Sequence, residues 1–174
     1  MATFKVKGGI KLKGDLHPQG AKNEALQVLC AVLLTPEEVI MENVPNIRDV
    51  NILIDLLRDL NVAVNKIDES TYSFMANNVD IDYLSSDAYK AKSSRIRGSI
   101  MIVGPLLARY GKGYIPRPGG DKIGRRRLDT HFIGFENLGA KFVYDSKEEF
   151  YRVTADQLKG ADMLLDEASV TGTA

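Results

Sequence analysis

The stretch Leu60-Asn61-Val62-Ala63-Val64 decides the fold, because a matching stretch, Leu138-Gly139-Ala140-Lys141-Phe142, follows 78 positions later. Upstream, Leu33-Leu34 has a counterpart in Leu106-Leu107, 73 positions on. Similarity that returns at a nearly fixed spacing indicates one structural unit written twice. Since the separation grows from 73 to 78, the second copy holds about five extra residues between 107 and 138. These belong to the loop Arg117 to Asp129.

Apolar periodicity predicts the same order of elements in both copies. For the first copy we expect a strand at 10–16, a helix at 22–34 that is apolar on nearly every side, a strand at 38–42, a helix capped by Asp49 with Val50, Leu53, Ile54 and Leu57 on one face, and a hairpin at 63–67 and 71–75. For the second we expect a weak strand near Asp80, a helix at 94–110 that Gly104-Pro105 kinks or breaks, a strand at 113–116, a helix at 128–138 and another hairpin.

These elements predict an α/β fold of repeated βαβαββ units, at about 7–76 and 80–155. A further apolar strand is expected at 161–165, with a third unit beginning at about 161. The chain ends at Ala174, where a third helix should start. We therefore expect a fragment of a longer protein, with two units and the start of a third.

Composition narrows the function classes. Lys plus Arg and Asp plus Glu both number 23, so no net charge favours nucleic acid or a membrane surface. Cys30 has no partner for an intrachain disulfide, and neither a secretory signal nor an apolar run of roughly 20 residues occurs. His17 and His131 are too far from further ligands to predict a metal site. A cytoplasmic protein that binds no metal is expected.

The loop Arg117 to Asp129 has the composition of an anion site. Pro118-Gly119-Gly120 leaves backbone N–H groups accessible, and Lys122 with Arg125-Arg126-Arg127 supplies cations that pair with phosphate or carboxylate. Asp121 lies among them. A solvated surface loop, with Asp121 satisfying turn N–H groups, is an equally open interpretation at this point.

Polar residues also stand at corresponding helix starts. Lys22 and Asn23 follow Gly20-Ala21 at the first helix, Arg97 takes the comparable place in the second copy, and Ser169-Val170-Thr171 takes it in the third. The positive end of a helix dipole suits an anion. If the units surround a pseudo-threefold axis, these helix starts converge on one site.

Four motifs together resemble the UDP-N-acetylglucosamine enolpyruvyl transferases, and the match runs from Phe4 to the last residue. They are Gly20-Ala21-Lys22-Asn23, Gly104-Pro105-Leu106-Leu107-Ala108-Arg109, Pro118-Gly119-Gly120-Asp121-Lys122-Ile123-Gly124 and Ser169-Val170-Thr171-Gly172-Thr173. The resemblance implies an inside-out α/β barrel of βαβαββ units. It also implies transfer of the enolpyruvyl group of phosphoenolpyruvate to the 3-hydroxyl of UDP-N-acetylglucosamine, the first committed step of peptidoglycan synthesis, without a cofactor.

The same resemblance implies roles for individual residues. Lys22 and Asn23 would contact phosphoenolpyruvate. Residues expected to bind UDP-N-acetylglucosamine are Arg97, Arg126, Arg127, Leu128, Asp129, Thr130, Glu167, Ala168, Ser169 and Val170. Asp121 stands where the family usually has a catalytic cysteine and would act as the proton donor, which predicts resistance to fosfomycin. Arg127 and Glu167 depart from the usual proline and lysine, so their nucleotide contacts are open.

The resemblance also divides the chain. Residues 1–21 would belong to the other domain of the family's enzymes, and residues 22–174 would form one incomplete domain. Further catalytic residues would lie in a C-terminal remainder, so this chain alone is expected to be inactive.

Two alternatives stay open. The first is the shikimate-pathway enolpyruvyl transferase, which shares the fold but lacks the long Pro-Gly-Gly loop. The second, from another class, is a non-enzymatic nucleic-acid-binding module that uses Lys122 and the triple arginine. The balanced charge and the absence of aromatic residues from the loop weigh against it.

Overall fold

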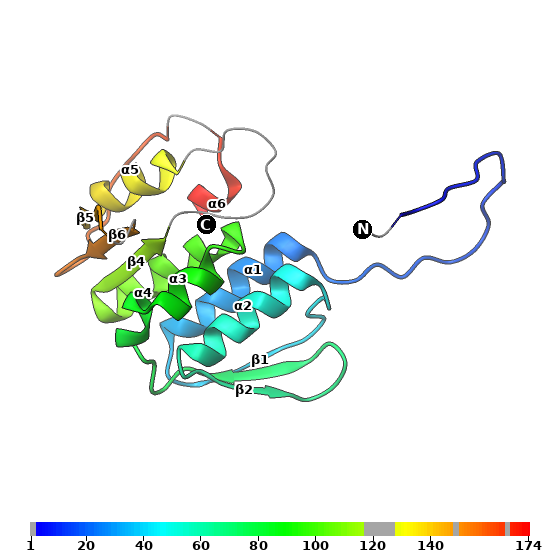
Figure 1. Cartoon of the computed structure of the whole chain (residues 1–174), viewed down its shortest axis with the longest axis horizontal. Coiled ribbons are helices and arrows are strands. Elements are labelled where there is room, and N and C mark those ends of the chain that lie inside the picture. The colour runs from blue at the N-terminus through cyan, green and yellow to red at the C-terminus, as the bar shows by residue number, and fades with distance from the viewer. Residues whose placement is uncertain (1–2, 117–127, 148–149, 166–167) are drawn as a thin grey trace.

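The computed structural model describes residues 3–116, 128–147, 150–165 and 168–174. Two three-stranded antiparallel sheets carry helices on one side, and an extended N-terminal segment leaves this body (Figure 1). Most of the loop Arg117 to Asp129 lies outside the described residues. No helix in the described ranges is long and apolar enough to cross a membrane.

The first unit is built from helices and strands that alternate until a final hairpin. Its elements are α1 (Lys22–Ala31), the 3-10 helix η1 (Val32–Leu34), β1 (Glu38–Met41), α2 (Arg48–Asp59), β2 (Ala63–Lys66) and β3 (Tyr72–Met75). The hairpin turn is held by Asp68, whose Oδ1 accepts hydrogen bonds of 2.8 Å from the N–H groups of both Ser70 and Thr71.

The second unit repeats this order after additional helical turns. Its elements are η2 (Asp82–Ser85), α3 (Asp87–Ser93), η3 (Arg97–Ile102), α4 (Val103–Tyr110), β4 (Lys112–Pro116), α5 (Asp129–Asn137), β5 (Lys141–Asp145) and β6 (Phe150–Thr154). The predicted helix at 94–110 is therefore η3 followed by α4, with the change of helix type just before Gly104-Pro105. The start of a third helix, α6 (Val170–Thr173), follows.

Sheet topology confirms the duplication. The strand orders are β1-β3-β2 and β4-β6-β5, so in each sheet the last strand of the unit lies between the other two. Val39 and Val64 both face Phe74 in the first sheet, and Gly113 and Phe142 both face Val153 in the second. The register is thus repeated as well as the order.

Three predicted strands are wrong, at 10–16, near Asp80 and at 161–165. The first and third are extended but unpaired within the described residues, and a strand requires a neighbour that completes its hydrogen bonds. Near Asp80 the local side chains favour helical turns instead. Asp80 Oδ1 accepts from the N–H groups of Asp82 and Tyr83, and Ser86 Oγ caps α3 by accepting from Tyr89 N–H.

The cap predicted for the second helix is also wrong. Ile47 is the N-cap of α2, and Asp49 lies in the first helical turn, where its carboxylate complements the helix dipole. The predicted apolar face is confirmed, since Val50, Leu53, Ile54 and Leu57 are all buried.

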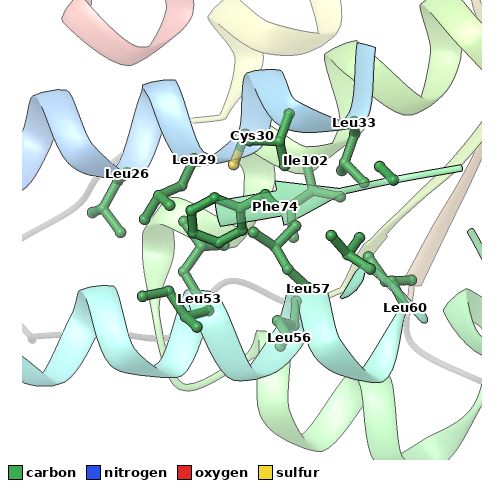
Figure 2. Packing of buried hydrophobic residues seen from close by; sticks show 14 of the residues in the cluster. Leu26, Leu29, Cys30, Leu33, Leu53, Leu56, Leu57, Leu60, Phe74 and Ile102 are labelled. Carbon is green, nitrogen blue, oxygen red and sulfur yellow. The ribbon is translucent and has the colours of Figure 1, made fainter. Parts of the chain in front are cut away.

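The main core lies between α1, α2 and β3. Leu29 and Leu33 from the first helical segment face Leu53 and Leu57 from α2, the ring of Phe74 lies between the two helices, and all five side chains are fully buried (Figure 2). Cys30 packs beside them, as predicted from its apolar neighbours, and burial raises the pKa of its thiol. The cluster includes Ile102 of the second unit, so the core extends across both units.

The two units meet along parallel helical segments. One segment runs from α1 into η1, and the other runs from η3 into α4. Because α1 lies beside η3 and η1 lies beside α4, the two segments start side by side and end side by side. At the starts, Gly98 is so close to Leu26 that an added Cβ would lie 3.0 Å from Leu26 Cδ1. This close approach sets the spacing between the segments that begin with Lys22 and Arg97.

Replacing Leu53 by alanine should lower the free energy of unfolding by about 2–5 kcal/mol, because the change leaves a cavity at the centre of the core. Leu34→Ala removes the same atoms from a side chain that is 52% exposed, and it should cost much less. Urea unfolding of both variants measures the difference. Equal losses would contradict the described core.

Candidate functional site

The start of α1 is shaped by a close backbone approach. A Cβ added to Gly20 would lie 2.1 Å from the carbonyl oxygen of Asn43, so a side chain at position 20 would displace the chain. Ala21 is the N-cap, and within the described part of the protein no side chain caps the helix. The first N–H groups of α1 are therefore directed beyond the helix, beside the exposed side chains of Lys22 and Asn23.

Lys22 makes an ion pair with the first turn of α2. Its Nζ lies 3.3 Å from Oδ2 of Asp49, and the two side chains are 49% and 41% exposed. A pair this exposed contributes little to stability. An anionic ligand can therefore replace Asp49 as the partner of Lys22 at small cost.

Arg97 is half-buried and is the first residue of η3, which lies next to α1. Its charge acts on His131, a residue of α5 that is 8% exposed. Burial first, and the positive charge of Arg97 second, lower the pKa of His131. His131 Nε2 also lies 3.5 Å from Thr171 Oγ1, so the ring connects the second unit with α6.

The starts of α5 and α6 pack together. Ser169 caps α6, because its Oγ accepts a 3.1 Å hydrogen bond from Gly172 N–H. A Cβ added to Gly172 would lie 3.0 Å from Thr130 Cγ2, which leaves no space for a side chain between the two helices. Thr130 is 2% exposed at this contact. Figure 1 shows α6 beside the beginning of α5.

Several predicted site residues thus belong to neighbouring helix starts. Lys22 and Asn23 begin α1, Arg97 begins η3, Leu128 and Asp129 begin α5 with Thr130, and Ser169 and Val170 begin α6. Val170 and Ala168 are exposed, whereas Leu128 and Asp129 are half-buried. Asp121, Arg126, Arg127 and Glu167 lie outside the described residues. The structure connects α1 with η3, Arg97 with His131, and α5 with α6.

Sequence reasoning missed His131, because it weighed this residue only as a metal ligand. The relevant signal was its place in the first turn of the helix after the long loop, directly after Asp129 and Thr130. Its ring lies 3.5 Å from Thr171 Oγ1, and the charge of Arg97 lowers its pKa, so residues from two other segments of the chain act on it.

The chemistry of these helix starts suits anions. Lys22 and Arg97 supply positive charge from adjacent parallel segments, and a helix start adds N–H donors. A neighbouring pocket of about 400 Å³ between α4, α5 and α6 is different, because residues such as Ile100, Met101 and Phe135 line it. An anion is therefore better matched by the helix starts than by this pocket.

A family model described as EPSP synthase (3-phosphoshikimate 1-carboxyvinyltransferase) matches residues 6–174. Among curated relatives, proteins named UDP-N-acetylglucosamine 1-carboxyvinyltransferase are 60% identical in Bacteroides fragilis and 53% identical in Porphyromonas gingivalis, each over all 174 residues. The chain spans about 40% of the length of these relatives.

Solved structures agree on the fold at low sequence identity. The enolpyruvyl transferase NikO from Streptomyces tendae superposes with a TM-score of 0.70 at 19% identity, covering 87% of this chain and 32% of that one. EPSP synthase from Acinetobacter baumannii gives 0.62 at 13% identity, covering 92% of this chain and 36% of that one. The described units therefore have the enolpyruvyl transferase fold.

The pKa of His131 should control part of the pH dependence of stability. Because this pKa is lowered in the folded chain, the unfolded chain takes up the proton at higher pH, near the ordinary value of 6.5. Well above that pH His131 is neutral in both states and does not reduce stability. The free energy of unfolding falls as the pH decreases through 6.5 toward the pKa of His131 in the folded chain.

Urea unfolding between pH 8 and pH 5 should therefore show a smaller loss in His131→Gln than in the unchanged chain. Proton NMR of the imidazole should also show the pKa of His131 rising in Arg97→Met, since one cause of its lowering has been removed. A pKa of His131 that is at or above 6.5 in the folded chain would contradict this assignment.

Proposed function

The chain belongs to the family of EPSP synthase (3-phosphoshikimate 1-carboxyvinyltransferase), and from this premise we propose that it is part of an enolpyruvyl transferase acting on UDP-N-acetylglucosamine. The reaction moves the enolpyruvyl group of phosphoenolpyruvate to the 3-hydroxyl of the sugar nucleotide and releases phosphate. This is the first committed step of peptidoglycan synthesis, in the cytoplasm. It needs no cofactor.

One observation carries the choice of sugar nucleotide within the family. Relatives named for UDP-N-acetylglucosamine are up to 60% identical to this chain over its whole length, whereas the EPSP synthase from Acinetobacter baumannii is 13% identical. The extra residues in the second unit, between Leu107 and Leu138, support the same choice, because the shikimate enzymes lack the long loop. Shikimate 3-phosphate, the acceptor of the shikimate enzymes, remains only the second candidate substrate.

In this proposal, different helix starts bind different substrates. Lys22 and Asn23, at the start of α1, bind phosphoenolpyruvate, whose phosphate or carboxylate displaces Asp49 from Lys22. Arg97, at the start of η3 where the second unit packs against α1 of the first, binds an anionic group of the sugar nucleotide. The remaining contacts come from the segments around α5 and α6, namely Arg126, Arg127, Leu128, Asp129 and Thr130, and Glu167, Ala168, Ser169 and Val170.

The chemistry requires one proton to be added and later removed. The sugar oxygen attacks C2 of phosphoenolpyruvate while C3 takes a proton, which gives a tetrahedral intermediate. The hydroxyl proton passes to a base, the C2–O bond to phosphate then breaks, and loss of a proton from C3 restores the double bond. We assign the first proton to the carboxyl group of Asp121. Such a group must be protonated to act, although nearby cations favour its ionised form.

Division of the chain between two domains belongs to the same proposal. Residues 1–21 would pair with the second domain, and their exposed apolar side chains support this. Phe4, Leu12 and Leu16 are 93%, 91% and 90% exposed, and they alternate with polar residues as in a strand with one buried face. The second domain would supply the other catalytic groups, so the 174-residue chain would be inactive by itself.

Substrate choice tests the proposal directly. The full-length enzyme should release phosphate from phosphoenolpyruvate in the presence of UDP-N-acetylglucosamine, and mass spectrometry should show the enolpyruvyl sugar nucleotide. Shikimate 3-phosphate should not replace the acceptor. Turnover of shikimate 3-phosphate alone would transfer the assignment to the second candidate.

A carboxyl group at position 121 predicts resistance to fosfomycin, since the epoxide alkylates a thiol and Asp121 cannot form that adduct. Full-length enzyme should keep its activity after incubation with fosfomycin. Asp121→Cys should be active and become sensitive, while Asp121→Ala should lose about 100-fold or more in kcat because it has no proton to donate. Rapid inactivation of the unchanged enzyme would disprove the role of Asp121.

A further inference from the structure

Arg109, near the end of α4, joins the second unit to the first. Its Nη1 donates hydrogen bonds to the carbonyl oxygens of Leu33, Thr35 and Ala76, at 3.1, 3.2 and 2.7 Å. The first two acceptors lie at the end of the helix that α1 begins, and the third follows β3. One nitrogen of the second unit thus holds three backbone groups of the first.

These acceptors suit a permanent cation. The last carbonyl groups of a helix have no partner within the helix, and they carry the negative end of its dipole. A guanidinium group matches them, because it combines a positive charge with several N–H donors. Ala76 is 1% exposed, and its carbonyl group would lose a buried hydrogen bond without Arg109.

The hydrogen bonds of Arg109 also affect how the two helical segments are aligned. Lys22 begins α1 and Leu33 lies in η1, while Arg97 begins η3 and Arg109 lies near the end of α4. The two segments run in parallel, with Gly98 against Leu26 near their starts and Arg109 on the carbonyl groups near their ends. Sliding one segment along the other would break the Arg109 contacts and displace Arg97 relative to Lys22.

We propose that Arg109 is a positioning residue that sets the axial register between the anion-binding helix starts of Lys22 and Arg97. The inference rests on the proposed function, in which these starts hold the two substrates. A slip of one residue moves a helical segment by about 1.5–2.0 Å. An error of about 1 Å in a reacting pair can reduce the rate about 100-fold.

The central experiment measures kcat and KM for both substrates in full-length enzyme carrying Arg109→Met, at a temperature where thermal denaturation shows it to be folded. We expect kcat/KM to fall by about 10- to 100-fold. Arg109→Lys, which keeps a charge and three donors on a shorter side chain, should recover part of this loss. The matched control is Arg58→Met, because Arg58 makes an exposed ion pair with Asp55 on α2 and should leave the kinetics unchanged.

A double-mutant cycle separates positioning from general stability. Once Arg97→Met has removed the group that Arg109 positions, Arg109→Met should reduce kcat/KM by less than about threefold more. Independent, multiplying losses would overturn the inference, as would a lower melting temperature of Arg109→Met with unchanged kcat/KM.

If Arg109→Met does not fold, Arg109→Lys decides the question. A reduction of about 3- to 10-fold in kcat/KM, with a melting temperature within a few degrees of the unchanged enzyme, would support the inference. Unchanged kinetics would overturn it while leaving the proposed function intact. Absence of product from the unchanged enzyme would instead refute the proposed function.

Discussion

Burial of the helix that begins at Lys22 is the constraint on which the rest of the structure depends. Leu29 and Leu33 are fully buried against α2 on one side, and α1 meets η3 on another. The polar side chains of Lys22, Asn23 and Glu24 lie at the exposed start of this helix. The packing that joins the units therefore also determines where Lys22 and Asn23 can offer charge and hydrogen bonds to a ligand.

Elements whose partners are close in sequence were predicted well. The hairpin of β2 and β3 and the apolar face of α2 follow from alternation and from 3.6-residue periodicity, and the repeat revealed the second copy. The strands expected at 10–16 and 161–165 failed because an alternating pattern does not identify a pairing partner. Near Asp80 the pattern was weak, and side-chain hydrogen bonds from Asp80 and Ser86 determined the local structure.

The candidate site shows the same division. The position of Lys22, Asn23, Arg97 and Ser169 at helix starts was predicted, because a helix start is visible in the sequence. His131 and Arg109 were not assigned functions, because their importance comes from contacts across the units. Nothing near Arg109 in the sequence indicates that it reaches Leu33 or Ala76. The place of a residue within one helix or strand can be predicted from the sequence, whereas a contact between two such elements is known only from the folded structure.

The repeated strand order also affects how the chain can fold. Every described strand pairing lies within one unit, from Glu38 with Met75 in the first sheet to Lys112 with Thr154 in the second. Contacts between residues that are near in sequence form with a smaller loss of chain entropy than distant ones. The first sheet can therefore close as soon as the ribosome has released the chain to residue 75, before the second unit has been made. Assembly in order of synthesis keeps the apolar strands of one unit from pairing with those of the other.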